Sequence, residues 1–132
     1  MYKWVGKYIG IPFVSNGRTL EGCDCYGLVR LVLHNEYGIE LPELSDDYSS
    51  ALNLAQTERL FAEKRPVLAA EKLSAAREKA VAVITERGVA AHIGIAAGGG
   101  YILHTGAKTD SICQRETHPG LRGRIEGYYN VC

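Results

Sequence analysis

The clearest pattern of apolar positions in the sequence begins at Cys25. The apolar residues that recur at helical spacing after it are Leu28, Val29 and Val32. Asp24 directly before this pattern is a favourable N-cap, and Gly38 directly after it supplies a stop. The pattern therefore predicts an amphipathic helix over 25–37.

The segments on either side of this helix have weaker patterns. Residues 1–24 scatter glycines and a proline among short apolar stretches, which predicts a short helix or turn and then irregular chain. After an extended connector at 38–44, we expect a second helix over about 47–64, ended by Pro66. Residues 67–79 are rich in Ala, Glu and Lys, which favours a third helix.

The second half of the chain alternates short apolar segments with turn residues. Strands are predicted over 80–85, 89–97, 101–104, 111–115 and 124–131, with turns at 86–88 and 98–100. Helices followed by hairpin-linked strands predict an α+β fold with an antiparallel sheet. The sequence contains no internal repeat, low-complexity tract or linker, so we expect a single domain over 1–132.

Composition and charge narrow the classes of function. The chain has 132 residues, of which 46% are hydrophobic, and its 15 basic and 15 acidic residues give a formal net charge of zero. A nucleic-acid binder usually has a basic excess, so we expect no nucleic-acid partner. No apolar run approaches the ~18 residues of a membrane span, and residues 1–7 have no signal-peptide core. We therefore expect a protein made in the reducing cytoplasm.

Four cysteines in a reducing compartment are expected to be thiols rather than a disulfide framework. Cys23 and Cys25 are too close in sequence to bridge without strain, and Cys113 and Cys132 lie far away. At the start of a helix, the dipole and free N–H groups favour a Cys25 thiolate, and its own N–H can face an oxyanion. We expect Cys25 alone to show enhanced alkylation at neutral pH, and Gly27 to leave room for a substrate backbone. The competing interpretation is a buried core cysteine.

Two histidines on neighbouring predicted strands bear on this choice. If the glycine turn is centred on Gly98, His92 lies opposite His104, and if it is centred on Gly99, Gly94 lies opposite His104 with His92 on the diagonal. Both registers place the two imidazoles on one face of the sheet, whereas a turn centre shifted by half a residue would place them on opposite faces. One histidine can then act as a base toward a thiol while the other orients it.

Four segments, in order along the chain, form a recognisable set: 9–13 (IGIPF), 22–29 (GCDCYGLV), 92–95 (HIGI) and 102–104 (ILH). With these segments the sequence resembles the NlpC family of papain-like cell-wall cysteine peptidases. The aromatic Tyr26, the stretch 38–42 and the closing 127–129 (GYY) are similar to the branch found in phage tails and prophages.

The resemblance implies a mechanism and a set of partners. Cys25 would be the nucleophile, His92 the general base and His104 the orienting residue, with no cofactor or metal. The substrate would be a peptidoglycan stem peptide, cut beside D-glutamate and diaminopimelate, and phage tail proteins would be partners that carry the protein to the wall.

The sequence departs from the family pattern around the expected substrate site, where we place Phe13, Asp24 and Tyr26. Many members carry tyrosine where Phe13 stands and serine where Tyr26 stands, and both hydroxyls usually help to hold substrate. The family's Gly-Asp turn before the first strand is replaced by Glu78-Lys79. These changes leave the three catalytic residues in place.

Three other functions compete with the peptidase. Cys23, Cys25, His92 and His104 could form a zinc tetrad, although Cys-x-Cys is an unusual spacing for one. The domain could be a tail-tip or assembly module without turnover, or a thiol amidase or acyltransferase with the same triad. A basic stretch near the C-terminus, formed by Arg115, His118, Arg122 and Arg124, is interpreted as a solvated face, with contact to an anionic polymer as the alternative.

Overall fold

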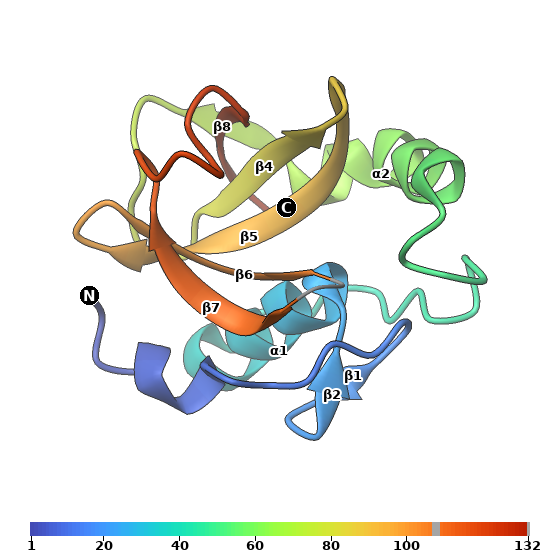
Figure 1. Cartoon of the computed structure of the whole chain (residues 1–132), viewed down its shortest axis with the longest axis horizontal. Helices are drawn as coiled ribbons and strands as arrows, with labels where there is room; N and C mark the ends of the chain where they lie inside the picture. The colour runs from blue at the N-terminus through green and yellow to red at the C-terminus, as the bar shows by residue number, and fades with distance from the viewer. Residues whose placement is uncertain (107–108, 132) are drawn as a thin grey trace.

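The computed structural model of the chain describes residues 1–106 and 109–131, which form a six-stranded antiparallel sheet flanked by helices (Figure 1). The strand order is β3-β8-β4-β5-β6-β7. The bounds are β3 (Glu71–Leu73), β4 (Val81–Glu86), β5 (Val89–Gly98), β6 (Tyr101–Gly106), β7 (Thr109–Arg115) and β8 (Ile125–Asn130). A separate hairpin pairs β1 (Arg18–Thr19) with β2 (Gly22–Cys23).

The helices lie where they can cover the middle strands of the sheet. A short 3-10 helix, η1 (Val5–Tyr8), precedes α1 (Cys25–Tyr37) and α2 (Leu54–Leu68). Helix α1 packs against β5 and β6, and α2 packs against β5 (Figure 1). The Asp24 side chain caps α1 by accepting from the Gly27 N–H, and Gly38 ends the helix in the left-handed region at φ 66°. The predicted α+β fold is confirmed, as are the bounds of α1.

The buried apolar side chains form a core between α1 and the sheet. Val29, Val32 and Leu33 of α1 and Val83, Ile95 and Leu103 of the strands are fully buried. A smaller cluster on the opposite side of the sheet is formed by Ala82, Ile84, Ile102 and Leu121. Adjacent residues of β4 thus enter different clusters, which fixes the strand's register against its neighbours.

The predicted second helix is present, but its predicted bounds are wrong. Helix α2 begins at Leu54 instead of about 47, because the Asn16 amide donates to the carbonyls of Ser45 and Tyr48 and holds that stretch in an irregular conformation. The helix continues past Pro66, which lies in its last turn, where the missing N–H breaks only one helical bond.

The predicted third helix over 67–79 is absent from the structure. Its residues instead contribute β3, which pairs with β8 at the edge of the sheet, with Lys72 opposite Tyr129. The strong helix propensity of Ala, Glu and Lys is overridden by the backbone hydrogen bonds that β8 offers.

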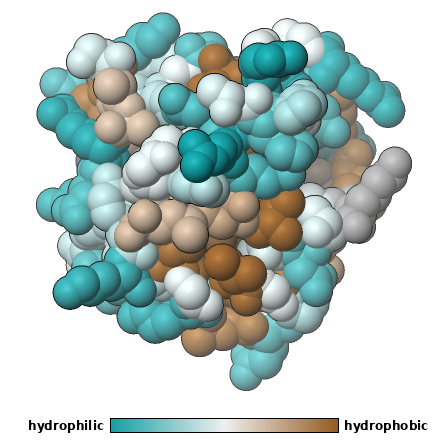
Figure 2. Space-filling model, turned by 60° about the vertical axis from the view of Figure 1, so that its left-hand side comes forward, coloured by the Kyte–Doolittle hydropathy of each residue, from teal (hydrophilic) through white to brown (hydrophobic). Residues whose placement is uncertain are grey.

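One face of the surface carries a band of apolar residues within a mostly polar surrounding (Figure 2). The exposed large hydrophobic residues of the described parts of the chain are Met1, Ile9, Val14, Leu20 and Leu52.

Among the described residues, none of the helices has the length and apolar character needed to traverse a membrane.

Candidate active site

Cys25 lies at the first position of α1, on the wall of a cleft of about 450 Å³. Cys25 is partly buried and packs against the core that includes Ile93 of β5. A smaller cavity of about 50 Å³, lined by Leu60 and other apolar side chains, also reaches Cys25. The sulfur is therefore at the junction of two cavities.

The two predicted histidines line the same cleft as Cys25. His92 on β5 and His104 on β6 approach with 3.3 Å between Nε2 of His92 and Nδ1 of His104. The pairing of Ile95 with Leu103 corresponds to the register centred on Gly99, which places His92 on the diagonal from His104. The prediction that both imidazoles share a face is confirmed, and the structure selects between the two registers.

Gly94 is the residue that lets the histidines come this close. A Cβ at position 94 would lie 2.9 Å from the Leu103 carbonyl oxygen and 3.1 Å from the His104 Cβ. Both distances are shorter than ordinary contacts, so a side chain here would push β6 and His104 away from β5. The glycine of the His-x-Gly-Ile segment thus has a packing role between the strands.

Gln114 on β7, which is not among the predicted site residues, extends the line of polar side chains. Its Oε1 lies 2.7 Å from Nε2 of His104. Ile112 pairs directly with His104, so Gln114 is on the same face one diagonal further along. The signal available in the sequence was this two-residue spacing within the predicted strand 111–115.

The contacts to Gln114 define which nitrogens carry protons. A carbonyl oxygen of Gln114 can only accept, so Nε2 of His104 donates and its Nδ1 is left as an acceptor. Nδ1 of His104 then accepts from Nε2–H of His92. In the neutral pair this leaves Nδ1 of His92 free to accept a proton.

The ionisation of the resting site differs from the sequence prediction. Burial, and next the Asp24 carboxylate, raise the pKa of the Cys25 thiol to about 12, outweighing the N–H groups of Ile93 and Tyr26 that favour the thiolate. Burial, and next the neighbouring His104, lower the pKa of His92 to about 3. A resting thiolate stabilised by the helix dipole is therefore a wrong prediction, since both groups are neutral at pH 7.

This ionisation predicts slow, pH-dependent alkylation of Cys25 in the ligand-free protein. The thiolate is the reactive species, so we expect the iodoacetamide rate to rise about tenfold per pH unit between pH 7 and 9. Peptide mapping after brief labelling at each pH measures the rate, and Cys25→Ser identifies the labelled position. A rate that stays level from pH 5 to 8 would instead show a resting thiolate–imidazolium pair.

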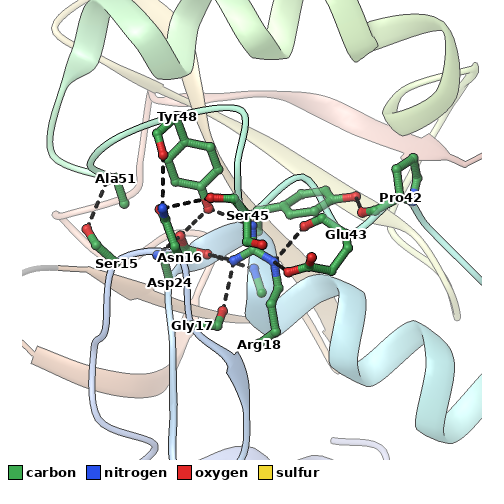
Figure 3. A network of polar contacts seen from close by, with 12 residues as sticks. Ser15, Asn16, Gly17, Arg18, Asp24, Pro42, Glu43, Ser45, Tyr48 and Ala51 are labelled. Atoms are coloured by element: carbon green, nitrogen blue, oxygen red, sulfur yellow. Dashed lines mark hydrogen bonds and ion pairs between the residues drawn. The ribbon is translucent and has the colours of Figure 1, made fainter.

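Asp24, predicted to bind substrate, lies at the centre of a buried polar network (Figure 3). Its carboxylate accepts from the N–H groups of Asn16 and Gly27 at 2.9 and 2.8 Å, from Arg18 at 3.0 Å and from the Tyr48 hydroxyl. Only 1% of Asp24 is exposed. Both carboxylate oxygens of Asp24 already accept hydrogen bonds from protein groups. We therefore assign Asp24 the role of holding two loops against the start of α1.

Arg18 balances the charge of Asp24 and joins the network to the chain after α1. Its guanidinium donates to the carbonyls of Gly17 and Glu43 at 2.8 and 2.7 Å (Figure 3). It also lies 5.2 Å and 5.6 Å from the ring centres of Tyr26 and Tyr48. The cation is thus held between two aromatic rings and the carboxylate of Asp24, the residue directly before Cys25.

The other two residues expected at the substrate site have different surroundings. The Tyr26 hydroxyl donates to the Pro42 carbonyl and the side chain is mostly buried, which leaves the ring as the part that lines the smaller cavity. Phe13 lines the large cleft together with Cys25 and the histidines. Phe13 is therefore the one of the three that shares the large cleft with Cys25 and both histidines.

Gly27 has a structural role in place of the predicted one. A Cβ at this position would lie 2.0 Å from the Gly17 carbonyl oxygen and 3.2 Å from the Cys23 Cβ. The glycine lets the loop of the Arg18 network pack directly on the first turn of α1. It faces protein backbone, so the expectation that it leaves room for substrate is wrong.

The zinc tetrad considered in the sequence analysis is not assembled. Within residues 1–106 and 109–131, no three His, Cys, Asp or Glu side chains are grouped so that they could hold a metal ion. Cys23 is fully buried, and both ring nitrogens of His104 face protein partners. Cys23, Cys25 and Cys113 are free thiols, and Cys132 lies outside the described residues.

The predicted basic stretch is divided between surface and cleft. Arg115 stacks over the ring of Tyr101 with 4.9 Å to its centre, and Arg122 is exposed. Arg124 instead lines the cleft that holds Cys25 and the histidines. The interpretation of a wholly solvated face is therefore wrong for Arg124.

In this fold a helix begins with a cysteine and packs on an antiparallel sheet that carries two facing histidines. This arrangement defines a papain-like α+β protein with a thiol–imidazole cleft. The model of the NlpC/P60 family matches residues 10–122. The chain therefore belongs to the NlpC/P60 family, a family of cysteine peptidases, as the sequence resemblance predicted.

Solved structures share this fold at low sequence identity. The NlpC/P60 domain of the peptidoglycan hydrolase SagA matches with a TM-score of 0.63 at 20% identity, over 96% of this chain and 92% of that one. An NlpC/P60 family protein from Bacillus cereus matches with a TM-score of 0.64 at 19% identity, over 94% of this chain. A lipoprotein-like NLP/P60 family protein from Staphylococcus aureus matches with a TM-score of 0.61 at 19% identity, over 95% of this chain.

A curated relative matches a shorter segment. The gamma-DL-glutamyl hydrolase of Bacillus subtilis is 49% identical over 41 residues, which is 30% of this chain and 10% of that protein. The chain also spans only 36% and 38% of the B. cereus and S. aureus chains.

Proposed function

We propose that the protein is a cysteine endopeptidase that cuts peptide bonds in bacterial peptidoglycan, at the bond between D-glutamate and diaminopimelate. The observation that carries the proposal is the cleft in which Cys25 meets the hydrogen-bonded line His92–His104–Gln114. A thiol, a base with a free nitrogen and a residue that orients the base are the groups that acyl transfer through sulfur requires.

The arrangement supports a general-base mechanism. As the Cys25 sulfur attacks the scissile carbonyl, its proton passes to Nδ1 of His92, and the oxyanion faces the Cys25 N–H. The imidazolium of His92 is stabilised by His104 and gives its proton to the leaving amine, which departs as the thioester forms. Water then attacks the thioester, losing a proton to His92, and the acid is released as Cys25 regains its proton.

The choice of bond is supported by a relative and by the family. The matched segment of the B. subtilis protein belongs to a gamma-DL-glutamyl hydrolase, and SagA is a peptidoglycan hydrolase. A stem peptide joins D-glutamate to diaminopimelate through the γ-carboxyl, so one cleft chemistry serves both kinds of substrate.

Digestion of purified peptidoglycan, followed by mass identification of the muropeptides, tests the proposal. We expect fragments that end in D-glutamate and fragments with a new amino group on diaminopimelate, and neither with Cys25→Ala. Products cut at a different amide or acyl group would favour the thiol amidase or acyltransferase. No product from a folded wild-type protein would favour the non-catalytic assembly module.

Position 13 offers a test of substrate contacts within the cleft. Phe13 has no hydroxyl where many relatives have one, so Phe13→Tyr is expected to raise kcat/KM on L-Ala-γ-D-Glu-diaminopimelate-D-Ala by about fivefold, because a recovered hydrogen bond contributes ~1 kcal/mol. Steady-state kinetics measure the change, with Phe61→Tyr as a matched control on α2 that lines only the smaller cavity. An unchanged or lower kcat/KM in the folded Phe13→Tyr variant would show that position 13 does not contact the peptide.

We extend the proposal to a phage-tail setting on the sequence features that resemble that branch. Two of the three, Tyr26 and the stretch ending at Pro42, are joined by a hydrogen bond from the Tyr26 hydroxyl to the Pro42 carbonyl. Mass spectrometry of purified tail particles from the producing strain tests this, and particles that lack the protein would contradict it.

A further inference from the structure

Arg124 is a fixed cation on the wall of the cleft, and the mechanism above gives it no role. Its Nε donates to the Thr85 carbonyl at 2.8 Å and its Nη1 donates to the Gly120 carbonyl at 2.7 Å. Within the described parts of the chain, Nη2 has no hydrogen-bond partner, and Arg124 forms no ion pair with any carboxylate. The guanidinium is thus anchored through one edge, with donors left over.

Arg124 lies in the same cleft as Cys25 and the two histidines, and it is half-buried. Burial is the main cause of the lowered pKa of His92 and of His104, and the charge of Arg124 adds to it in both cases. Arg87 also lines this cleft, where Glu86 is the single acidic residue among the described lining residues. The cleft therefore presents a net positive wall to whatever lies against Cys25.

A γ-linked glutamyl substrate carries the matching charge. When the γ-carboxyl of glutamate forms the scissile amide, the α-carboxylate remains free on the acyl side of the bond, within the same residue. A guanidinium N–H to a carboxylate is a charge-assisted hydrogen bond, which is stronger than a bond between neutral groups.

We propose that Arg124 binds the free α-carboxylate of the γ-linked glutamate and so makes the cleft selective for the acid over its amide. This inference rests on the proposed function, because the carboxylate belongs to the proposed substrate. It adds the substrate group that is recognised, the α-carboxylate, and the residue that binds it, Arg124. Arg87, which is exposed, is not needed for this contact.

Two matched peptides test the role of Arg124 without any change to the protein. They are L-Ala-γ-D-Glu-diaminopimelate and the same peptide with the glutamate α-carboxylate amidated, as in D-isoglutamine. We expect wild-type kcat/KM to be at least about tenfold higher for the acid, mostly through KM, because a bond to a charged group is being exchanged for a weaker one. Equal turnover of the two peptides would overturn the role of Arg124 and leave the proposed function intact. Turnover of neither would overturn both.

Variants then assign the preference to this side chain. Arg124→Gln is expected to lose the preference through a fall in activity on the acid peptide, with little change on the amide. Arg124→Lys keeps a cation and should keep part of the preference. This variant keeps the proposal testable if Arg124→Gln fails to fold. Arg122→Gln is the matched control, because Arg122 is exposed and lies outside the lining residues of the cleft. A tenfold preference that persists in folded Arg124→Gln would overturn the assignment.

Discussion

Replacing His92 by alanine is expected to lower kcat by roughly 10³- to 10⁴-fold, the upper part of the about 10²- to 10⁴-fold range that a general base contributes. His92 must take the thiol proton and return it to the leaving amine. His104 cannot replace it, because both of its ring nitrogens face protein partners. His104→Asn is expected to cost no more than about 10²-fold, because the asparagine oxygen can accept from Nε2–H of His92 and preserve its tautomer.

Steady-state kinetics on L-Ala-γ-D-Glu-diaminopimelate, with circular dichroism to check folding, compare the two variants. If folded His104→Asn were as inactive as His92→Ala, the division into base and orienting residue would be wrong. The His104→Asn variant also removes the imidazole nitrogen that contacts Gln114. Its activity therefore includes the loss of that contact.

The largest effect on stability is expected at Asp24. Asp24→Ala removes the N-cap of α1 and leaves the Arg18 cation, whose side chain is only 9% exposed, without its carboxylate. Breaking a buried ion pair on one side costs about 3–5 kcal/mol in the free energy of unfolding. Urea denaturation measures the loss.

Asp47→Ala is the matched control, since Asp47 is exposed and forms no ion pair within the described residues. A surface change of this kind is expected to alter stability by less than about 0.5 kcal/mol. If Asp24→Ala raised KM and left stability near the control, Asp24 would be a substrate-binding residue after all, and the network in Figure 3 would be secondary.

The strongly periodic parts of the sequence were sufficient to predict the helix that begins at Cys25 and the strands of the two histidines. Cys25 follows a capping aspartate, and His92 and His104 flank a glycine turn, so local rules place all three. The register stayed open because the turn can be centred on Gly98 or on Gly99, and the pairing of β5 with β6 decides between them.

The contacts that complete the site come from segments without periodicity. Asn16, Arg18 and Tyr48 lie in irregular chain or a two-residue strand, so no pattern predicts that they converge on Asp24. Arg124 was grouped with surface residues because its carbonyl partners at Thr85 and Gly120 exist only in the folded chain.

The wrong prediction of a resting thiolate has a similar origin. A helix N-terminus favours the thiolate by local geometry, but the burial of Cys25 and the charge of Asp24 act through the tertiary structure and are larger. The third helix over 67–79 failed for the same kind of reason, since β8 supplies Glu71 and Lys72 with strand partners that the local sequence cannot reveal.

The most direct test of the account is the detection of an acyl-enzyme on Cys25. Rapid mixing with L-Ala-γ-D-Glu-diaminopimelate, acid quenching and mass spectrometry of the peptide that contains Cys25 would measure it. If Cys25 forms a thioester, this peptide gains the mass of the L-Ala-γ-D-Glu acyl group within the first turnover, while free diaminopimelate is released. Release of diaminopimelate with no mass gain at Cys25, or unchanged release by folded Cys25→Ala, would rule out Cys25 as the nucleophile.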